Sequence, residues 1–215
     1  MDTDLFMDTD APIKSLRELA AAEAACRRCP LWREATQAVP GAGPREAAVM
    51  LVGEQPGDKE DIEGKPFVGP AGRMLDAALA DAGIERGETF VTNAVKHFKF
   101  ERRGKRRLHK RPNNAEVEHC RIWLDAERRL VKPRAIVALG VTAARGLTGK
   151  TLTIAKVRGK PFGAADGATL FVTVHPSALL RIEDDAERHA AYAAFVADLK
   201  VVAKALSAAE RTAAR

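Results

Sequence analysis

Residues 47–53 read AAVMLVG, an apolar run that ends in glycine and leads into the polar stretch EQPGDKED at 54–61. An apolar run without polar alternation predicts a strand that is buried on both faces of a sheet. Similar runs follow at 89–95, 134–139 and 170–174, and helix-forming segments separate them. The expected fold class is therefore α/β, a three-layer α/β/α arrangement with a central, mainly parallel four-stranded sheet.

Five segments before, between and after these strands predict helices. They are residues 12–25, 69–83, 114–131, 141–147 and 185–208. The stretch 54–61 is so rich in turn residues that we expect an irregular loop there. No linker divides the chain, so we expect a single domain from residue 12 to 215. Residues 1–11 are acidic and repeat MDTD, which predicts a disordered leader.

One segment carries the positive charge of the chain. Residues 96–111 hold nine Lys/Arg and one acid, a net charge of +8, whereas the whole chain is +6, so the remainder is −2. A like-charged block of this kind predicts a cationic loop that binds a polyanion. No apolar run approaches the roughly 20 residues that span a bilayer, and the acidic start is no targeting signal. We expect a cytoplasmic monomer, in the bacterial cytosol or nucleoid, with no membrane partner.

Polar clusters follow three of the predicted strands, at 54–61, 93–111 and 175–177. Ligands of parallel sheets bind outside the carboxyl ends of the strands, so these clusters predict one shared cleft. A carboxylate such as Glu54 orients water or a histidine for attack, and Phe67 stacks on a planar base. Asn93 suits the edge of a pyrimidine, and His175 stabilises a charged leaving group. The competing interpretations are a core position for Phe67, a structural hydrogen bond for Asn93 and a merely solvated His175.

Three cysteines, Cys26, Cys29 and Cys120, argue against a disulfide framework and favour a metal centre. His97 or His119 would supply a fourth ligand. We favour His97, because His119 neighbours Cys120 on a predicted helix and would point about 100° away from it. Zinc and an iron–sulfur cluster both remain open on this pattern, as do three buried free thiols.

Taken together, several motifs resemble the uracil-DNA glycosylase superfamily, in particular its iron–sulfur, family 4-like branch. They are CRRCPL, GEQPGDKEDIEGKPFVGPAGRML, VTNAVK, the helix with Cys120, VALGVTAA and VHPSALL. The resemblance implies an enzyme acting on uracil-containing DNA, with a [4Fe-4S] cluster held by Cys26, Cys29, His97 and Cys120. It implies uracil binding by Gln55, Asp58, Phe67, Asn93 and His175.

Three departures from the family 4 pattern are similar to its UdgX branch. His97 stands where family 4 enzymes carry cysteine, Gln55 stands in the GEQPGDKED motif, and the inserted basic segment contains KRRLH. The resemblance implies that His109 becomes covalently bonded to C1′ of the abasic site in a single turnover, with Glu54 and His175 as the other catalytic residues. DNA-binding residues would be Lys105, Arg106, Arg107, Lys110 and Ser177.

Two other functions compete with this one. The first is a conventional multi-turnover glycosylase in which His109 only contacts DNA. The second is a non-catalytic, metal-containing DNA-binding module.

Overall fold

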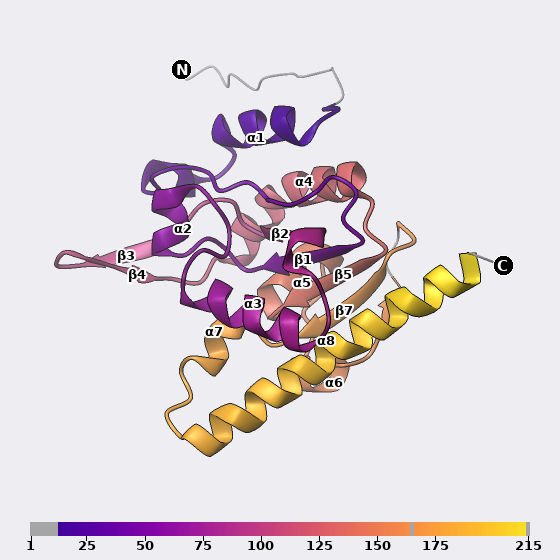
Figure 1. Cartoon of the computed structure of the whole chain (residues 1–215). Helices are drawn as coiled ribbons and strands as arrows, with labels where there is room; N and C mark the ends of the chain where they lie inside the picture. The colour runs from indigo at the N-terminus through magenta and orange to yellow at the C-terminus, as the bar shows by residue number, and fades with distance from the viewer. Residues whose placement is uncertain (1–12, 164–165, 214–215) are drawn as a thin grey trace.

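Four parallel strands form the centre of the computed structural model, which describes residues 13–163 and 166–213 (Figure 1). They are β1 (Val49–Gly53), β2 (Thr89–Asn93), β5 (Ala135–Leu139) and β7 (Thr169–Thr173), in the order β2-β1-β5-β7. The two-residue strand β6 (Phe162–Gly163) pairs antiparallel with β7 at one edge. The prediction of a mainly parallel four-stranded sheet is confirmed, and β6 is an addition to it.

Side chains of successive strand residues point to opposite faces of the sheet, and each face has its own core. Val49 and Leu51 belong to one hydrophobic cluster, and Met50 and Val52 belong to the other. Helices α3 (Pro70–Asp81) and α8 (Asp185–Ala213) cover the first face (Figure 1). Helices α4 (Asn114–Val131) and α5 (Val141–Thr148) cover the second, and α1 (Leu16–Ala24) packs on α4. The three-layer prediction is thus confirmed.

Short helical segments lie between these elements. They are η1 (Pro30–Arg33), α2 (Asp58–Glu63), η2 (Arg86–Glu88), α6 (Ile154–Val157) and α7 (Pro176–Leu179). Among the described residues, no helix combines the length and apolar character needed to cross a membrane. The predicted leader, residues 1–11, lies outside the described residues.

The stretch after β1 is not wholly the irregular loop that its composition predicted, because α2 begins at Asp58 and occupies its second half. Gly57 precedes the helix, and Glu60 accepts a hydrogen bond from the Gly57 N–H at 3.0 Å. Asp58, Glu60 and Asp61 all lie in the first turn, where the helix dipole favours negative charge. The acids that suggested a polar loop therefore stabilise a helix.

The cationic segment is also ordered differently from the predicted loop. It folds into an antiparallel hairpin of β3 (Phe100–Arg103) and β4 (Arg106–His109), in which Phe100 pairs with His109. Gly104 provides the left-handed turn at its tip, with φ of 60°. The hairpin projects from the side of the molecule at which β2 ends (Figure 1).

Candidate active site

Polar residues gather where the parallel strands end, as the sequence predicted. Glu54 follows β1, Asn93 ends β2, Thr142 lies in the first turn of α5 after β5, and His175 follows β7. Thr142 donates a hydrogen bond to Glu54, which joins the ends of β5 and β1. Phe67 stacks beside His175 with ring centroids 6.2 Å apart. The three predicted clusters therefore share one site.

An aromatic ring and an amide meet at the end of β1. A side chain at Gly53 would place Cβ 2.3 Å from Asn93 Oδ1 and 2.8 Å from Phe67 Cζ. Phe67 itself has a positive φ of 58°, and a Cβ at Gly72 would lie 1.7 Å from the Phe67 carbonyl oxygen. Both glycines are thus needed for this close packing. A wall of this kind suits a flat ligand that carries hydrogen-bonding groups.

His175 is held as a neutral hydrogen-bond donor. Its Nδ1 accepts a hydrogen bond from the Ser177 N–H at 3.2 Å and lies 2.8 Å from Ser177 Oγ. Burial lowers the pKa of His175 to about 4. A neutral ring that accepts through Nδ1 carries its proton on Nε2, which can then donate to a developing anion. Ser177, predicted to bind DNA, positions this histidine.

Glu54 forms the polar centre of the site. Its Oε1 lies 3.2 Å from His109 Nε2, and its Oε2 accepts from Thr142 and lies 3.5 Å from Arg111 Nε. Burial raises the pKa of Glu54, but the hydrogen bonds from His109 and Thr142, with the charge of Arg111, outweigh burial and lower it overall. Glu54 is therefore an ionised carboxylate in contact with the imidazole of the hairpin.

Gln55 uses its side chain to hold the base of the hairpin. The amide nitrogen donates to the carbonyl oxygens of Lys99 at 3.0 Å and Lys110 at 3.2 Å, and the amide oxygen accepts from the Lys99 N–H at 3.1 Å. These two lysines flank the hairpin and are themselves joined by a backbone hydrogen bond of 2.9 Å. Sequence reasoning missed this role, because nothing local shows that residues 55, 99 and 110 meet.

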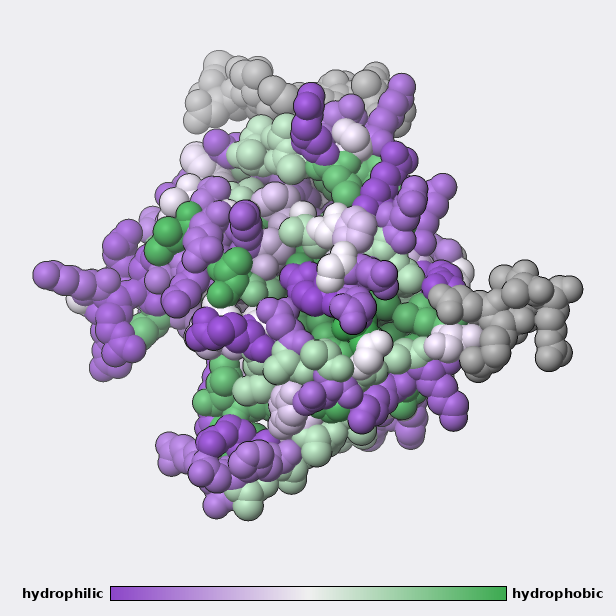
Figure 2. Space-filling model, in the orientation of Figure 1, coloured by the Kyte–Doolittle hydropathy of each residue, from purple (hydrophilic) through white to green (hydrophobic). Residues whose placement is uncertain are grey.

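The predicted DNA-binding residues divide into two groups. Lys105 and Arg106 are exposed on the hairpin, which forms a hydrophilic projection in Figure 2, and Lys110 is exposed directly after it. Arg107 instead turns toward the body and forms an ion pair with Asp58 at 2.6 Å. Asp58, predicted to bind uracil, is therefore occupied by this arginine.

The three cysteines lie around an apolar patch between the N-terminal segment and α4. Cys29 and Cys120 are buried with Leu31, Val95 and Val117, and Trp123 packs against this group. The Trp123 Nε1–H donates to Cys26 Sγ at 3.2 Å, and the Lys96 N–H donates to Cys120 Sγ at 3.2 Å. Donors of this kind to sulfur tune iron–sulfur centres, so these surroundings fit such a group.

His97 is buried at the exit of β2, and burial together with the charge of Arg27 lowers its pKa to about 4. It is therefore available as a neutral ligand, whereas the alternative, His119, is exposed. Within residues 13–163 and 166–213, no three His, Cys, Asp or Glu side chains lie close enough to hold a single metal ion. The [4Fe-4S] cluster and its ligands remain a prediction.

A buried ion pair joins the segment after β2 to α4, and sequence reasoning missed it. Lys96 is fully buried, and its Nζ lies 2.7 Å from Glu127 Oε2 and 2.6 Å from Thr92 Oγ1. Lys96 Nζ also donates to the carbonyl oxygen of Asn93 at 3.1 Å. The network fixes the backbone of Asn93 at the site. The only sequence signal was a lysine directly after the apolar run 89–95.

Comparison with known proteins identifies the family. Residues 40–200 match the family described as the Uracil DNA glycosylase superfamily. A Type-4 uracil-DNA glycosylase of Pyrobaculum aerophilum is 40% identical over 163 residues, which cover 73% of this chain and 80% of that protein. The Type-4 enzyme of Archaeoglobus fulgidus is 33% identical over 175 residues, 78% of this chain and 84% of the relative. A Type-5 uracil-DNA glycosylase of Pyrobaculum aerophilum is 33% identical over 171 residues, 71% of each chain. With most of its length matched and its polar strand ends gathered in one site, this chain belongs to the uracil-DNA glycosylase superfamily.

Proposed function

We propose that this protein excises uracil from DNA and is then bonded through His109 to C1′ of the resulting abasic site. Family membership and relatives named as uracil-DNA glycosylases support the excision. One observation carries the covalent step: His109 Nε2 lies 3.2 Å from the ionised carboxylate of Glu54. The similarity to the UdgX branch rests on that histidine, on Gln55 and on His97.

Excision begins with a uracil nucleotide turned out of the stacked DNA, which costs a few kcal/mol. Phe67 stacks on the base and Asn93 binds its edge. The Nε2–H of His175 donates a hydrogen bond to the oxygen of uracil on which negative charge develops. The Gln55 N–H, which donates to no atom of the described residues, is a second donor for that charge.

The covalent step follows from the contact between His109 and Glu54. The C1′–N1 bond breaks with its electron pair on uracil, which leaves C1′ electron-deficient. One ring nitrogen of neutral His109 donates its lone pair to C1′, and the ring N–H proton passes to Glu54. The product is a neutral N-alkyl imidazole without a good leaving group, so each protein molecule acts once.

The remaining site residues bind DNA or hold the cluster. Lys105, Arg106 and Lys110 contact DNA phosphates in a salt-dependent manner. A [4Fe-4S] cluster on Cys26, Cys29, Cys120 and His97 would tie the N-terminal segment to α4 as a structural centre. We also propose that the protein is a single domain and functions in the cytoplasm as a monomer.

The test is a denaturing gel after mixing the protein with single-stranded DNA that contains one uracil. We expect a heat- and detergent-resistant protein–DNA band, which is absent with His109→Ala and with DNA that contains thymine instead. His109→Ser should release uracil repeatedly, because water reaches C1′ once the nucleophile is removed. A wild-type protein that releases uracil in many turnovers without the band would refute the covalent step.

A conventional multi-turnover enzyme is the second candidate, and the names of the Type-4 relatives favour it. In that case Glu54 would activate water, and His109 would only contact DNA. The same gel separates the two, since free abasic DNA would accumulate beyond one molecule for each protein.

A further inference from the structure

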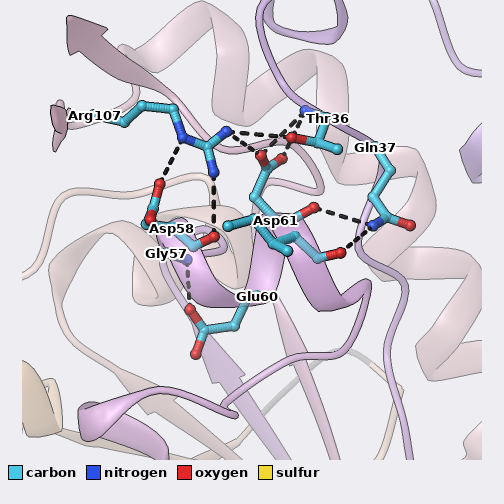
Figure 3. A network of polar contacts seen from close by, with 8 residues as sticks. Thr36, Gln37, Gly57, Asp58, Glu60, Asp61 and Arg107 are labelled. Atoms are coloured by element: carbon cyan, nitrogen blue, oxygen red, sulfur yellow. Dashed lines mark hydrogen bonds and ion pairs between the residues drawn. The ribbon is translucent and has the colours of Figure 1, made fainter. Parts of the chain in front are cut away.

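Arg107 joins β4 to two other segments (Figure 3). Its Nε donates to Asp58 Oδ1 at 2.6 Å, and its Nη1 donates to Asp61 Oδ2 at 2.6 Å. Nη1 also lies 3.2 Å from Thr36 Oγ1, in the segment that follows η1. One guanidinium therefore connects the hairpin to α2 and to the chain that leads away from the cysteines.

Asp61 is the buried centre of this junction. Its side chain is 0% exposed, and its two oxygens accept from the Thr36 N–H at 3.0 and 3.1 Å. Gln37 donates to the carbonyl oxygens of Asp61 and Ile62, which fastens the same segment to α2. Burying an ionised carboxylate is unfavourable unless hydrogen-bond donors and a cation compensate for its lost hydration. Arg107 supplies that cation.

The arginine is also packed. Its side chain is 15% exposed, and Cζ lies 5.5 Å from the ring centroid of Phe98 and 5.1 Å from that of Phe100. These distances are within the range of cation–π contact. Two carboxylates neutralise its charge, so Arg107 differs from its exposed neighbour Arg106, which remains open to phosphate.

Strand geometry connects this junction to the nucleophile. Residues two apart on a strand share a face, so Arg107 and His109 lie on the same side of β4, about 7 Å apart along the strand. In the described chain, β3 and β4 pair only with each other. A lone two-stranded hairpin is marginally stable, so its orientation depends on anchors elsewhere. Gln55 holds the base, and Arg107 anchors β4 itself, on the face that carries His109.

We propose that Arg107 is a positioning residue that aims His109 at C1′, and so decides whether His109 or water captures that carbon after uracil has left. This inference rests on the proposed function. When water attacks, its oxygen bonds to C1′, its proton leaves, and the product is a free abasic site. Arg107 makes no hydrogen bond or ion pair with Phe67, Asn93 or His175, so release of uracil does not depend on it.

The test measures the division between the two products. Wild type, Arg107→Gln, Asp61→Asn and Arg103→Gln are each mixed, in saturating excess, with end-labelled single-stranded DNA that contains one uracil. Quenched samples are run on denaturing gels with and without alkali, which cleaves free abasic DNA. The covalent band and the cleaved band are then read separately, and their sum gives the rate of uracil release. Arg103 is the matched control, because it is an exposed arginine of the same hairpin.

We expect Arg107→Gln and Asp61→Asn to release uracil at the wild-type rate but to shift the ratio of covalent to free product about 100-fold toward free abasic DNA, the effect of a misplacement of about 1 Å. Arg103→Gln should keep the wild-type ratio. An unchanged ratio in Arg107→Gln, or an equal fall in both products, would overturn the proposal.

Hydrogen exchange provides a readout that needs no covalent chemistry. The amides of residues 100–109 should exchange faster in Arg107→Gln than in Arg103→Gln, and equal rates would also overturn the proposal. A wild-type protein that never forms the covalent band refutes the proposed function instead, and the exchange comparison still decides whether Arg107 anchors the hairpin.

Discussion

His109 Nε2 and Glu54 Oε1 lie 3.2 Å apart, although the histidine is on the hairpin of β3 and β4 and the glutamate directly follows the central strand β1. The contact brings an imidazole to the carboxyl edge of the sheet, where parallel α/β sheets bind their ligands. It also gives the imidazole a base that lies beside it, which is the arrangement of an activated nucleophile.

Glu54→Gln should slow formation of the covalent product about 10²–10⁴-fold, the range that a positioned base contributes. Glutamine preserves the size of the side chain and an acceptor for Thr142 but cannot take a proton from His109. The rate is measured in a single turnover on a denaturing gel, with thermal unfolding as the control for folding. A covalent product that forms at the wild-type rate would remove Glu54 from the mechanism.

Gln55→Ala should loosen the hairpin without unfolding the domain. Three hydrogen bonds to Lys99 and Lys110 are lost, and each contributes about 0.5–1.5 kcal/mol. Amide exchange in residues 100–109 should therefore accelerate by at least about tenfold, while exchange in β1 and β5 stays unchanged. Uniform acceleration over the sheet would show that Gln55 stabilises the fold as a whole.

His175 should remain neutral down to a pH of about 4, because burial lowers its pKa. The unfolded chain binds a proton at this histidine below about 6.5, whereas the folded protein does so only near 4. Its contribution to stability is therefore present above pH 6.5 and is lost as the pH falls toward 4.

An NMR titration of the imidazole, assigned by comparison with His175→Gln, measures this directly. The expected midpoint is near pH 4, and the melting temperature of His175→Gln should depend less on pH between 6.5 and 4. A midpoint near 6.5 would show that His175 is protonated too readily to act as a neutral donor.

The fourth prediction concerns the metal centre. Purified protein should be brown and contain iron, and Cys120→Ser should lose both. His97→Cys should retain the iron, because a thiolate replaces the imidazole, and His119→Ala is the matched control that changes an exposed histidine. A colourless protein that binds zinc, or iron that disappears in His119→Ala, would contradict the assigned ligands.

The sheet could be predicted because its strands are buried on both faces and appear as apolar runs. The two errors of local structure have physical causes. The acids that suggested a loop at 54–61 stabilise the first turn of α2, where the helix dipole favours them. The dense positive charge of residues 96–111 predicts a loop, and it masks the strand pattern in which Phe100 pairs with His109.

The site was predictable only in part for a similar reason. Glu54, Asn93 and His175 lie at strand ends, so topology alone brings them together. The contacts of Gln55 with Lys110 and of Arg107 with Asp61 join residues that lie 55 and 46 positions apart. Such long-range contacts leave no periodic pattern in the sequence, because they depend on how the hairpin packs against the rest of the domain.

The most direct test of the account is mass spectrometry of the protein after reaction with uracil-containing single-stranded DNA and digestion of both components. We predict that the sugar remnant is found on one peptide and that fragmentation places it on His109, with one remnant for each protein molecule. An unmodified His109 peptide, together with uracil released in large excess over protein, would contradict the central claim.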